Sequence, residues 1–243
     1  MKKIIYAIII ILLIATLIIS NYFLYKNKKE DKEQEDIFEN IIDIAENTDD
    51  TQKNEEINMQ ELYNINNDIV GWIKIDNTNI SYPVMQTKEN PNYYLRKNFY
   101  KKYSLWGTPF LAENCDIKSS DNLIIYGHHI NNSKMFGELE KYKDEEFCKS
   151  HNIIKFYTME DKSEYEIISV LKTVVYDSTG FQYYKYINFN NKDEFDTFID
   201  RCNELSFFSF KEKANYKDKL LTLSTCEYSK QNGRLVIIAK KIN

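Results

Sequence analysis

LTLSTCEY, residues 221–228, is the most informative stretch of this 243-residue chain. Leucine and threonine dominate the run from Leu220 to Thr225, and this composition predicts a β-strand that ends beside Cys226. The end of a strand is rigid enough to hold a sulfur atom in a fixed position against a base. The stretch therefore indicates a cysteine nucleophile, whose partners have to come from other parts of the chain.

A histidine can serve such a cysteine as a base or as a cationic neighbour, which a thiol with an ordinary pKa of about 8.5 needs at neutral pH. The chain has three histidines: His128, His129 and His151. His128 follows Gly127 at the end of an apolar run, where a side chain can project into a cleft. His129 would point the other way if the strand continued. We therefore expect His128 to be catalytic, and His129 and His151 to be structural or surface residues.

Arg234 lies eight residues after Cys226 in a chain that has many lysines but only three arginines. Its planar guanidinium can hold a substrate carbonyl and stabilise an oxyanion, which a rotating ammonium does less well. If residues 227–233 loop back, Arg234 opens the last strand beside Cys226. The alternative is a surface ion pair on an edge strand, and the spacing favours the catalytic interpretation.

Composition bounds the class of protein. The chain is 43% hydrophobic and 14% aromatic, enough to bury one sizeable core but not to suggest two large domains. Its formal net charge is −5, and its lysines are interleaved with acidic residues. Such a surface has no basic stripe, so nucleic-acid binding is disfavoured.

No cofactor or metal ion is expected from the residue pattern. Adjacent histidines on an extended chain diverge, and no CxxC or HExxH pattern occurs, so a zinc site made by His128, His129 and Cys226 is disfavoured. The irregular spacing of the cysteines and the size of the domain also make disulfides unnecessary. The other cysteines are expected to be buried or free thiols: Cys115, Cys148 and Cys202.

The N-terminus predicts a membrane anchor within residues 1–25. Residues 4–19 carry no charge, and as a helix the 22 positions from 4 to 25 would extend about 33 Å, enough for a hydrocarbon core of about 30 Å. A cleaved signal peptide is the alternative, but no small-x-small pattern follows the apolar run. Lysines flank both sides, so the positive-inside rule does not decide the orientation.

Two further regions follow the anchor. Residues 26–57 are charged and predict a solvated tether that can contain a helix, and residues 58–243 predict one catalytic domain. This domain is mainly β, and eight short strands with irregular connections favour a β-barrel. The expected strands cover residues 69–75, 79–86, 108–112, 122–127, 152–158, 164–176, 219–225 and 234–240. Helical patterns cover residues 133–150 and 192–206.

An ordered series of motifs resembles the class B sortases, membrane-anchored cysteine transpeptidases of Gram-positive cell walls. The TLxTC signature of sortases lies within LTLSTC, and the resemblance covers about residues 60–243. The other motifs are NDIVGWIKI (67–75), ISYPVMQ (80–86), YL (94–95), GTPFL (107–111), IIYGHH (124–129) and MFGEL (135–139). The turn AENC at 112–115 departs from the small, aspartate-rich turn of the family.

The resemblance implies a fold and a mechanism. The fold would be an eight-stranded sortase-type β-barrel with N-terminal helices and a helix inserted before the last two strands. Cys226 would attack the carbonyl after the threonine of an NPxTx-like C-terminal sorting signal, while Arg234 stabilises the oxyanion. His128 would protonate the leaving amine and then activate an incoming amine of peptidoglycan. The partners would be surface proteins, peptidoglycan and the membrane, with the catalytic domain outside the cell.

The substrate pocket is expected next to the nucleophile. Ser224 and Thr225 precede Cys226, and Tyr183 and Tyr184 lie in the loop before the inserted helix, so all four are candidate substrate-binding residues. Two other functions remain open from the sequence. A cysteine peptidase would use the same residues but transfer the acyl group to water, and a membrane-tethered binding module with a degenerate site would share the fold without turnover.

Overall fold

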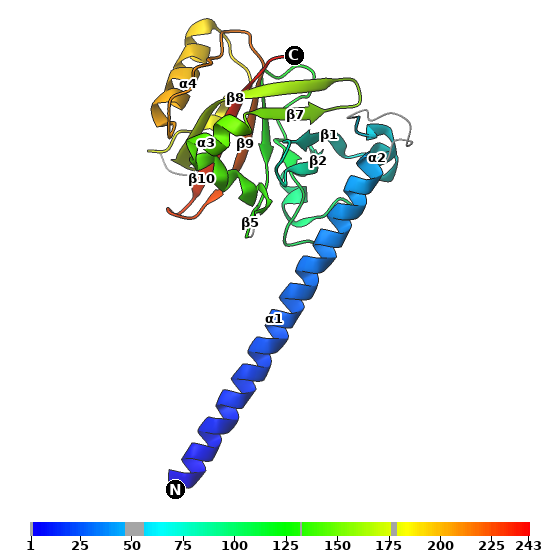
Figure 1. Ribbon diagram of the computed structural model, residues 1–243, viewed down its shortest axis with the longest axis vertical. Coiled ribbons are helices and arrows are strands. Elements are labelled where there is room, and N and C mark those ends of the chain that lie inside the picture. Colours follow the sequence, from blue (N-terminus) through cyan, green and yellow to red (C-terminus); the bar gives the residue numbers. More distant parts are fainter. Residues whose placement is uncertain (1, 47–55, 132, 176–178) are drawn as a thin grey trace. The chain divides into compact units, whose positions relative to one another are not determined.

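The computed structural model describes residues 2–46, 56–131, 133–175 and 179–243. The chain divides into two compact units, residues 1–41 and 42–243. Helix α1 (Lys2–Glu46) contains the whole apolar N-terminal stretch (Figure 1). It is long and apolar enough to cross a membrane, and the side chains of its apolar part are exposed.

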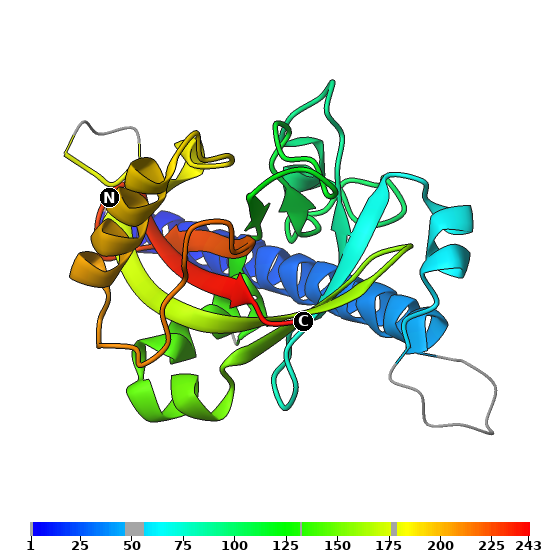
Figure 2. The ribbon, with the colours of Figure 1, turned by 90° about the horizontal axis from the view of Figure 1, so that it is seen from above.

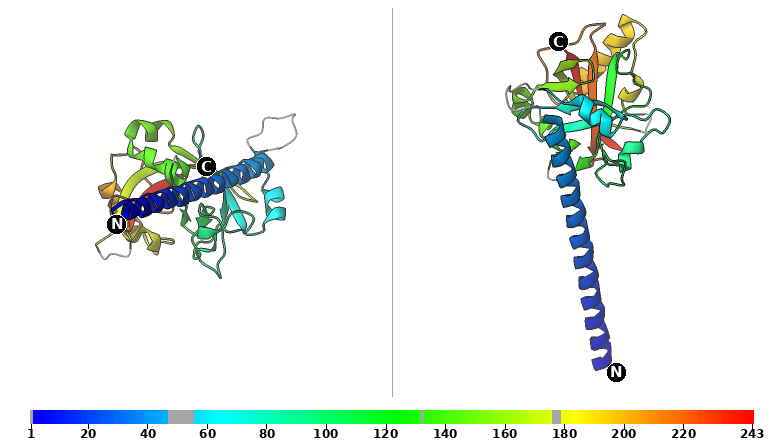
Figure 3. Two further views of the ribbon diagram at one scale, coloured as in Figure 1. Left: turned by 90° about the horizontal axis from the view of Figure 1, so that it is seen from below. Right: turned by 90° about the vertical axis from the view of Figure 1, so that its right-hand side faces the viewer.

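The charged segment that follows the apolar stretch is helical as far as Glu46, and Figure 3 shows α1 as one unbroken helix. Lys26 pairs with Glu30 and Lys29 with Glu33, both at a spacing of four residues. Such pairs stabilise an exposed helix by about 0.2–0.5 kcal/mol each. The rest of the expected tether, residues 47–55, lies outside the described residues.

Within the described residues, eight strands form a closed barrel in the order β1-β2-β3-β4-β9-β10-β8-β7, which confirms the expected fold class. Figure 2 shows the long strands β8 and β10 running side by side. The strands are β1 (Ile69–Lys74), β2 (Ser81–Met85), β3 (Phe110–Leu111), β4 (Asn122–Tyr126), β7 (Ile153–Tyr157), β8 (Lys162–Val174), β9 (Leu220–Glu227) and β10 (Gly233–Lys241). A separate two-stranded sheet consists of β5 (His129–Ile130) and β6 (Lys134–Met135).

Helices occupy the connections of the barrel. The inserted helix α4 (Lys192–Leu205) lies between β8 and β9 as predicted, and the side chain of Asn191 caps it by accepting from the backbone N–H of Glu194. The other helices are α2 (Met59–Ile65), α3 (Glu145–Ser150) and the 3-10 helices η1 (Tyr93–Arg96), η2 (Phe136–Lys143) and η3 (Tyr183–Lys185).

Residues 133–150 are largely helical as expected, but they also contain strand β6, and the helical part is divided into η2 and α3. Asp144 has an extended backbone, and its side chain accepts from the backbone N–H of Phe147. This N-cap ends η2 and starts α3, because a capping residue leaves the helical conformation.

Strand β9 is held from both sides. It pairs in parallel with β4 and antiparallel with β10, and its residues from Leu220 to Thr225 are buried. A strand with neighbours on both edges and cover on both faces needs a nearly continuous apolar run, as in parallel sheets. This explains why the decisive stretch of sequence has little polar alternation, and it makes the end of β9 a rigid platform.

Candidate active site

Cys226 lies just beyond the point where the pairing of β4 with β9 ends. The last pair in that ladder is Tyr126 with Ser224, and the backbone N–H of Gly127 still donates to the Ser224 carbonyl at 3.1 Å. Cys226 follows two residues later and is half-buried. The strand thus holds the cysteine backbone while leaving the residue partly open to solvent.

Arg234 lies directly opposite Cys226 in the β9–β10 ladder. Residues that face each other in antiparallel strands have Cβ atoms about 4.5–5.5 Å apart and point to the same face. The Arg234 guanidinium donates from Nη1 to the Gly233 carbonyl at 2.9 Å. The expected return of the chain beside Cys226 is therefore present, with β10 starting one residue earlier, at Gly233.

His128 lies between the end of β4 and the start of β5, and its ring Nε2 is 2.7 Å from the Leu95 carbonyl oxygen. A carbonyl only accepts, so Nε2 carries a hydrogen and, in the neutral ring, Nδ1 keeps its lone pair. Burial lowers the pKa of His128 below its usual range, and the positive charge of Arg96 acts in the same direction against the opposing hydrogen bond to Leu95.

One cleft of about 280 Å³ contains every residue that the sequence singled out for catalysis or substrate binding. The expected residues on its wall are His128, Cys226, Arg234, Ser224, Thr225, Tyr183 and Tyr184. Sequence reasoning missed the other half of the wall, which consists of Asn92, Leu95, Phe110, Glu113, Tyr126, Gly127 and Val175. Several of these lie in motifs that we quoted, but nothing local in the sequence shows that they face Cys226.

The four candidate substrate-binding residues differ in what their hydroxyl groups do. The hydroxyls of Ser224 and Tyr183 are 2.6 Å apart and buried, and burial raises the pKa of Tyr183 to about 12. Tyr184 is half-buried. The hydroxyl of Thr225 is buried and has no hydrogen-bond partner among the described residues. A buried hydroxyl without a partner is unfavourable by about 1–3 kcal/mol, so Thr225 is the residue of this set that gains most from a bound polar group.

The other two histidines lie elsewhere. His151 stacks on Phe147 with ring centroids 4.2 Å apart, and its Nδ1 lies 2.9 Å from the Phe147 carbonyl oxygen, as expected for a structural residue. His129 is absent from the wall of the cleft, but its ring Nδ1 lies 3.2 Å from the carbonyl oxygen of Cys226. The sequence gave no indication of that contact.

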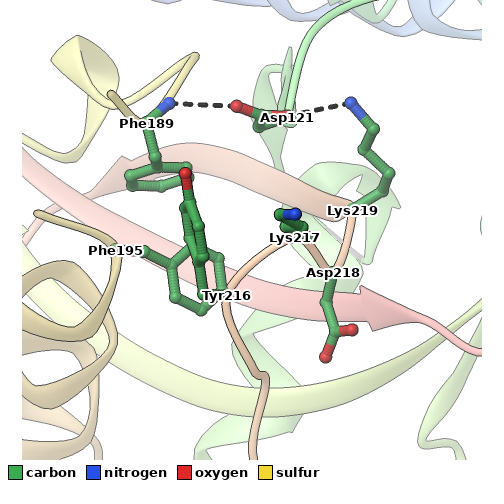
Figure 4. A pocket seen from close by; sticks show the side chains of 7 residues that line it. All are labelled: Asp121, Phe189, Phe195, Tyr216, Lys217, Asp218 and Lys219. Carbon is green, nitrogen blue, oxygen red and sulfur yellow. Dashed lines mark hydrogen bonds and ion pairs between the residues drawn. The ribbon is translucent and has the colours of Figure 1, made fainter. Parts of the chain in front are cut away.

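A second cavity, of about 240 Å³, has no cysteine or histidine among its described lining residues. Figure 4 shows its lining side chains, among which the Asp121 carboxylate accepts from Lys219 Nζ at 2.9 Å and from the Phe189 backbone N–H at 3.0 Å. The full lining is Asp121, Phe189, Phe195, Tyr216, Lys217, Asp218 and Lys219. The described part of the chain also has no group of three or more histidine, cysteine or acidic residues that could hold a metal ion. Among the four cysteines only Cys226 is not buried, so the cleft around it is the candidate site for thiol chemistry.

Comparison with known proteins identifies the domain. The family model described as "Sortase domain" matches residues 73–242. Sortase B of Staphylococcus aureus (strain NCTC 8325 / PS 47) is 35% identical over 186 residues, which are 75% of this chain and 74% of that protein. A structure of a Staphylococcus aureus sortase B–substrate complex has a TM-score of 0.70 at 34% identity, covering 76% of this chain and 84% of that one. Sortase B from B. anthracis, in complex with AAEK1, has a TM-score of 0.76 at 31% identity, covering 88% and 99%.

Proposed function

The chain belongs to the sortase family of cysteine transpeptidases, and on this premise we propose that it cleaves an NPxTx-like C-terminal sorting signal after threonine and joins the surface protein to an amine of peptidoglycan. The observation that carries the proposal is the pairing of Cys226 with Arg234 on adjacent strands, with His128 on the wall of the same cleft. These three residues are the proposed catalytic set. Sortase B from Staphylococcus aureus has been captured with substrate, which supports a peptide-binding role for the corresponding cleft.

The first half of the reaction forms a thioester. His128 takes the proton of the Cys226 thiol, the sulfur attacks the threonine carbonyl carbon, and the Arg234 guanidinium stabilises the resulting oxyanion through its N–H donors. The carbon–nitrogen bond then breaks, and His128 delivers a proton to the leaving amine. The N-terminal part of the substrate remains bound to sulfur as a thioacyl group.

The second half regenerates the thiol. An incoming amine attacks the thioester carbonyl, and His128 accepts its proton. The carbon–sulfur bond breaks as the new amide forms, and His128 returns the proton to the sulfur. Because burial lowers the pKa of His128, its ring is neutral in more of the molecules at neutral pH than an exposed histidine would be. A neutral ring with a free Nδ1 is the form that this second half requires.

We assign the peptide-binding wall to Ser224, Thr225, Tyr183 and Tyr184. The Ser224–Tyr183 hydrogen bond fixes the wall, because both hydroxyls are buried and satisfied by each other. The unpartnered Thr225 hydroxyl is the group best suited to bond a polar atom of the bound peptide. Tyr184 contributes a half-buried ring to the same wall.

We propose that the chain has three regions with different roles. Residues 1–25 form a single-pass membrane anchor with a short cytoplasmic end, residues 26–57 form a charged tether, and residues 58–243 form the catalytic domain outside the cell. The exposed apolar side chains of α1 support the anchor. An acceptor amine in the cell wall supports the outward orientation of the domain.

The test separates transfer from hydrolysis. The protein is incubated with a labelled NPxTx-like peptide, with and without a glycine peptide as the amine, and the products are identified by mass. A ligated product that depends on Cys226 is expected. Hydrolysis alone at every amine concentration would instead identify a cysteine peptidase, and the absence of thiol-dependent turnover would indicate a binding module.

A further inference from the structure

We propose that His129 is a positioning residue for the nucleophile: its imidazole N–H holds the carbonyl of Cys226 and ties the end of β9 to the helix η2. This inference deepens the proposed function and rests on it. His129 does not line the cleft, so it acts on the reaction only through Cys226.

The first step of the argument concerns the edge of β9. Successive carbonyls of a strand point to alternate edges, so the Cys226 carbonyl points to the same edge as that of Ser224. The Ser224 carbonyl accepts from the backbone of Gly127, but the β4 ladder ends there. At the next position along this edge, the His129 ring Nδ1 lies 3.2 Å from the Cys226 carbonyl oxygen. The His129 side chain thus occupies the position at which the next backbone N–H of β4 would donate to β9 if the ladder continued.

The second step fixes the hydrogen on the ring. Nδ1 of His129 also lies 3.8 Å from Oε1 of Glu140, and its side chain is 15% exposed. A carbonyl and a carboxylate both accept, so the hydrogen has to be on Nδ1. The backbone of His129 is held by pairing with Met135, and the ring of Tyr228 lies edge-on at 5.1 Å. The donor is therefore constrained in position and in tautomer.

The third step follows the charges behind the cysteine. Glu140 pairs with Lys143 at 2.6 Å, and Lys143 pairs with Glu227 at 3.1 Å. Lys172 of β8 lies 3.5 Å from the same Glu227 carboxylate. Charges of alternating sign therefore run from Glu140, beside His129, through Lys143 to the residue that follows Cys226. Two contacts therefore restrain the backbone at Cys226. His129 binds its carbonyl, and Lys143 pairs with the carboxylate of the next residue, Glu227.

Such fixation matters for rate because the sulfur has to meet the substrate carbonyl in a narrow range of positions. A displacement of about 1 Å can reduce the rate by about 10²-fold. Losing one of two restraints on the backbone is expected to shift the sulfur by less than that. A reduction of about tenfold in kcat is therefore expected when the His129 donor is lost.

The experiment compares substitutions of His129 that keep or move the nitrogen atom that donates to the Cys226 carbonyl. In His129→Asn the side-chain amide can place an N–H where Nδ1 was, whereas in His129→Gln the amide lies one carbon further out. We expect the asparagine variant to keep kcat within about threefold of the parent, and the glutamine and alanine variants to lose about tenfold in kcat. The KM for the peptide and the unfolding temperature should stay close to the parent in the asparagine and glutamine variants.

His151→Ala is the matched control, because it removes a structural histidine that does not contact Cys226. If the alanine variant at 129 does not fold, the asparagine–glutamine pair decides the outcome. Equal loss in those two variants, or no loss in either, overturns the proposal. The rate of Cys226 alkylation by iodoacetamide, measured on the same variants, should show the same order, and this readout remains informative even if the protein transfers no sorting signal.

Discussion

The four cysteines of the chain lie in two kinds of surroundings, and the difference shows what makes a thiol a nucleophile. Cys226 lies half-buried at the end of β9 in a cleft with His128 and Arg234. The other three are free thiols that are each 1% exposed: Cys115, Cys148 and Cys202. Burial raises the pKa of Cys115 to about 11 and that of Cys148 to about 12, and it raises the pKa of Cys202 as well. Position in the fold, rather than residue type, separates the two groups.

The buried cysteines contribute to packing and local hydrogen bonds. The Cys115 sulfur donates to the Asn122 carbonyl at 3.5 Å, and the Cys202 carbonyl accepts from the Ser169 hydroxyl at 2.9 Å. Within the part of the chain that the structure describes, no histidine or arginine lowers the pKa of either thiol. Cys226 instead lies half-buried in a cleft whose wall also contains His128 and Arg234.

The largest effect is expected from Cys226→Ala, which should abolish peptide cleavage and the thioacyl intermediate. Removal of one half-exposed sulfur at a strand end loses little packing, so the circular dichroism spectrum and unfolding temperature should match the parent. Mass spectrometry after incubation with a sorting-signal peptide detects the intermediate. Turnover that persists in this variant but disappears in Cys115→Ala, Cys148→Ala or Cys202→Ala would reassign the nucleophile.

His128→Ala should lower turnover by about 10²–10⁴-fold, the usual contribution of general acid–base catalysis. His129→Ala should lower it much less, because the second histidine lies behind the cysteine and outside the cleft. Steady-state kinetics on one peptide compares the two variants. Equal losses would contradict the assignment of the acid–base role to His128.

Arg234→Lys keeps the positive charge but loses the paired donors of the guanidinium. If Arg234 holds the oxyanion, turnover should fall by about 10²–10³-fold, the typical effect of one lost oxyanion donor. If its role were only to favour the thiolate of Cys226, lysine would serve as well. Iodoacetamide reactivity as a function of pH separates the roles: lost turnover with an unchanged alkylation profile supports the oxyanion role, and near-parental turnover contradicts it.

Glu227→Gln tests whether ion pairs stabilise the end of β9 next to Cys226. The three buried cysteines, in contrast, lie in the packed interior of the domain. Burial opposes ionisation of Glu227, but hydrogen bonds from Ser229 and Lys143 lower its pKa to about 2 from the usual 4.5. A lowered pKa stabilises the fold above about pH 4.5, and this contribution disappears as the pH falls towards about 2. The variant should lose about 1.5–3 kcal/mol of unfolding free energy at pH 7, the range for hydrogen bonds to charged groups.

Denaturant titrations of parent and Glu227→Gln at several pH values provide the measurement. The difference between the two proteins should shrink as the pH falls below about 4.5. A difference that stays constant from pH 7 to pH 3 would show that the lost packing, and not the charge, accounts for the effect. Glu164→Gln, at a half-buried position of β8, is a suitable control for the removal of one carboxylate charge from the barrel.

The smallest effect is expected from single alanine substitutions of the buried cysteines, which should each retain activity. A thiol reagent should label one cysteine in the native protein and all four after denaturation. Raised pKa values and burial both protect the other three from reaction. Rapid labelling of a second cysteine in the native protein would contradict the distinction between the accessible Cys226 and the three buried cysteines.

Local patterns in the sequence were sufficient to locate the eight barrel strands and the inserted helix, but not the short strands β5 and β6. The expected strands differ from the observed ones by at most two residues at either end, and the inserted helix was found at its apolar spacing. These features depend on neighbouring residues, whose alternation and turn chemistry are visible along the chain. The stretch 133–150 is largely helical as predicted, but the cap at Asp144 divides it into two helices, which the helical pattern did not indicate.

The sequence by itself was sufficient to predict Cys226 as the nucleophile with Arg234 and His128 as its partners, because TLSTC, Arg234 and YGHH are short and chemically distinctive. Only the tertiary structure decided that β4 pairs with β9 and that His129 reaches the carbonyl of Cys226, which is 97 residues away. The wall of the cleft and the charges behind the nucleophile also depend on contacts between distant segments. Such contacts are fixed by closing the whole barrel, since the free energy of packing belongs to the assembled core and not to any one stretch of chain.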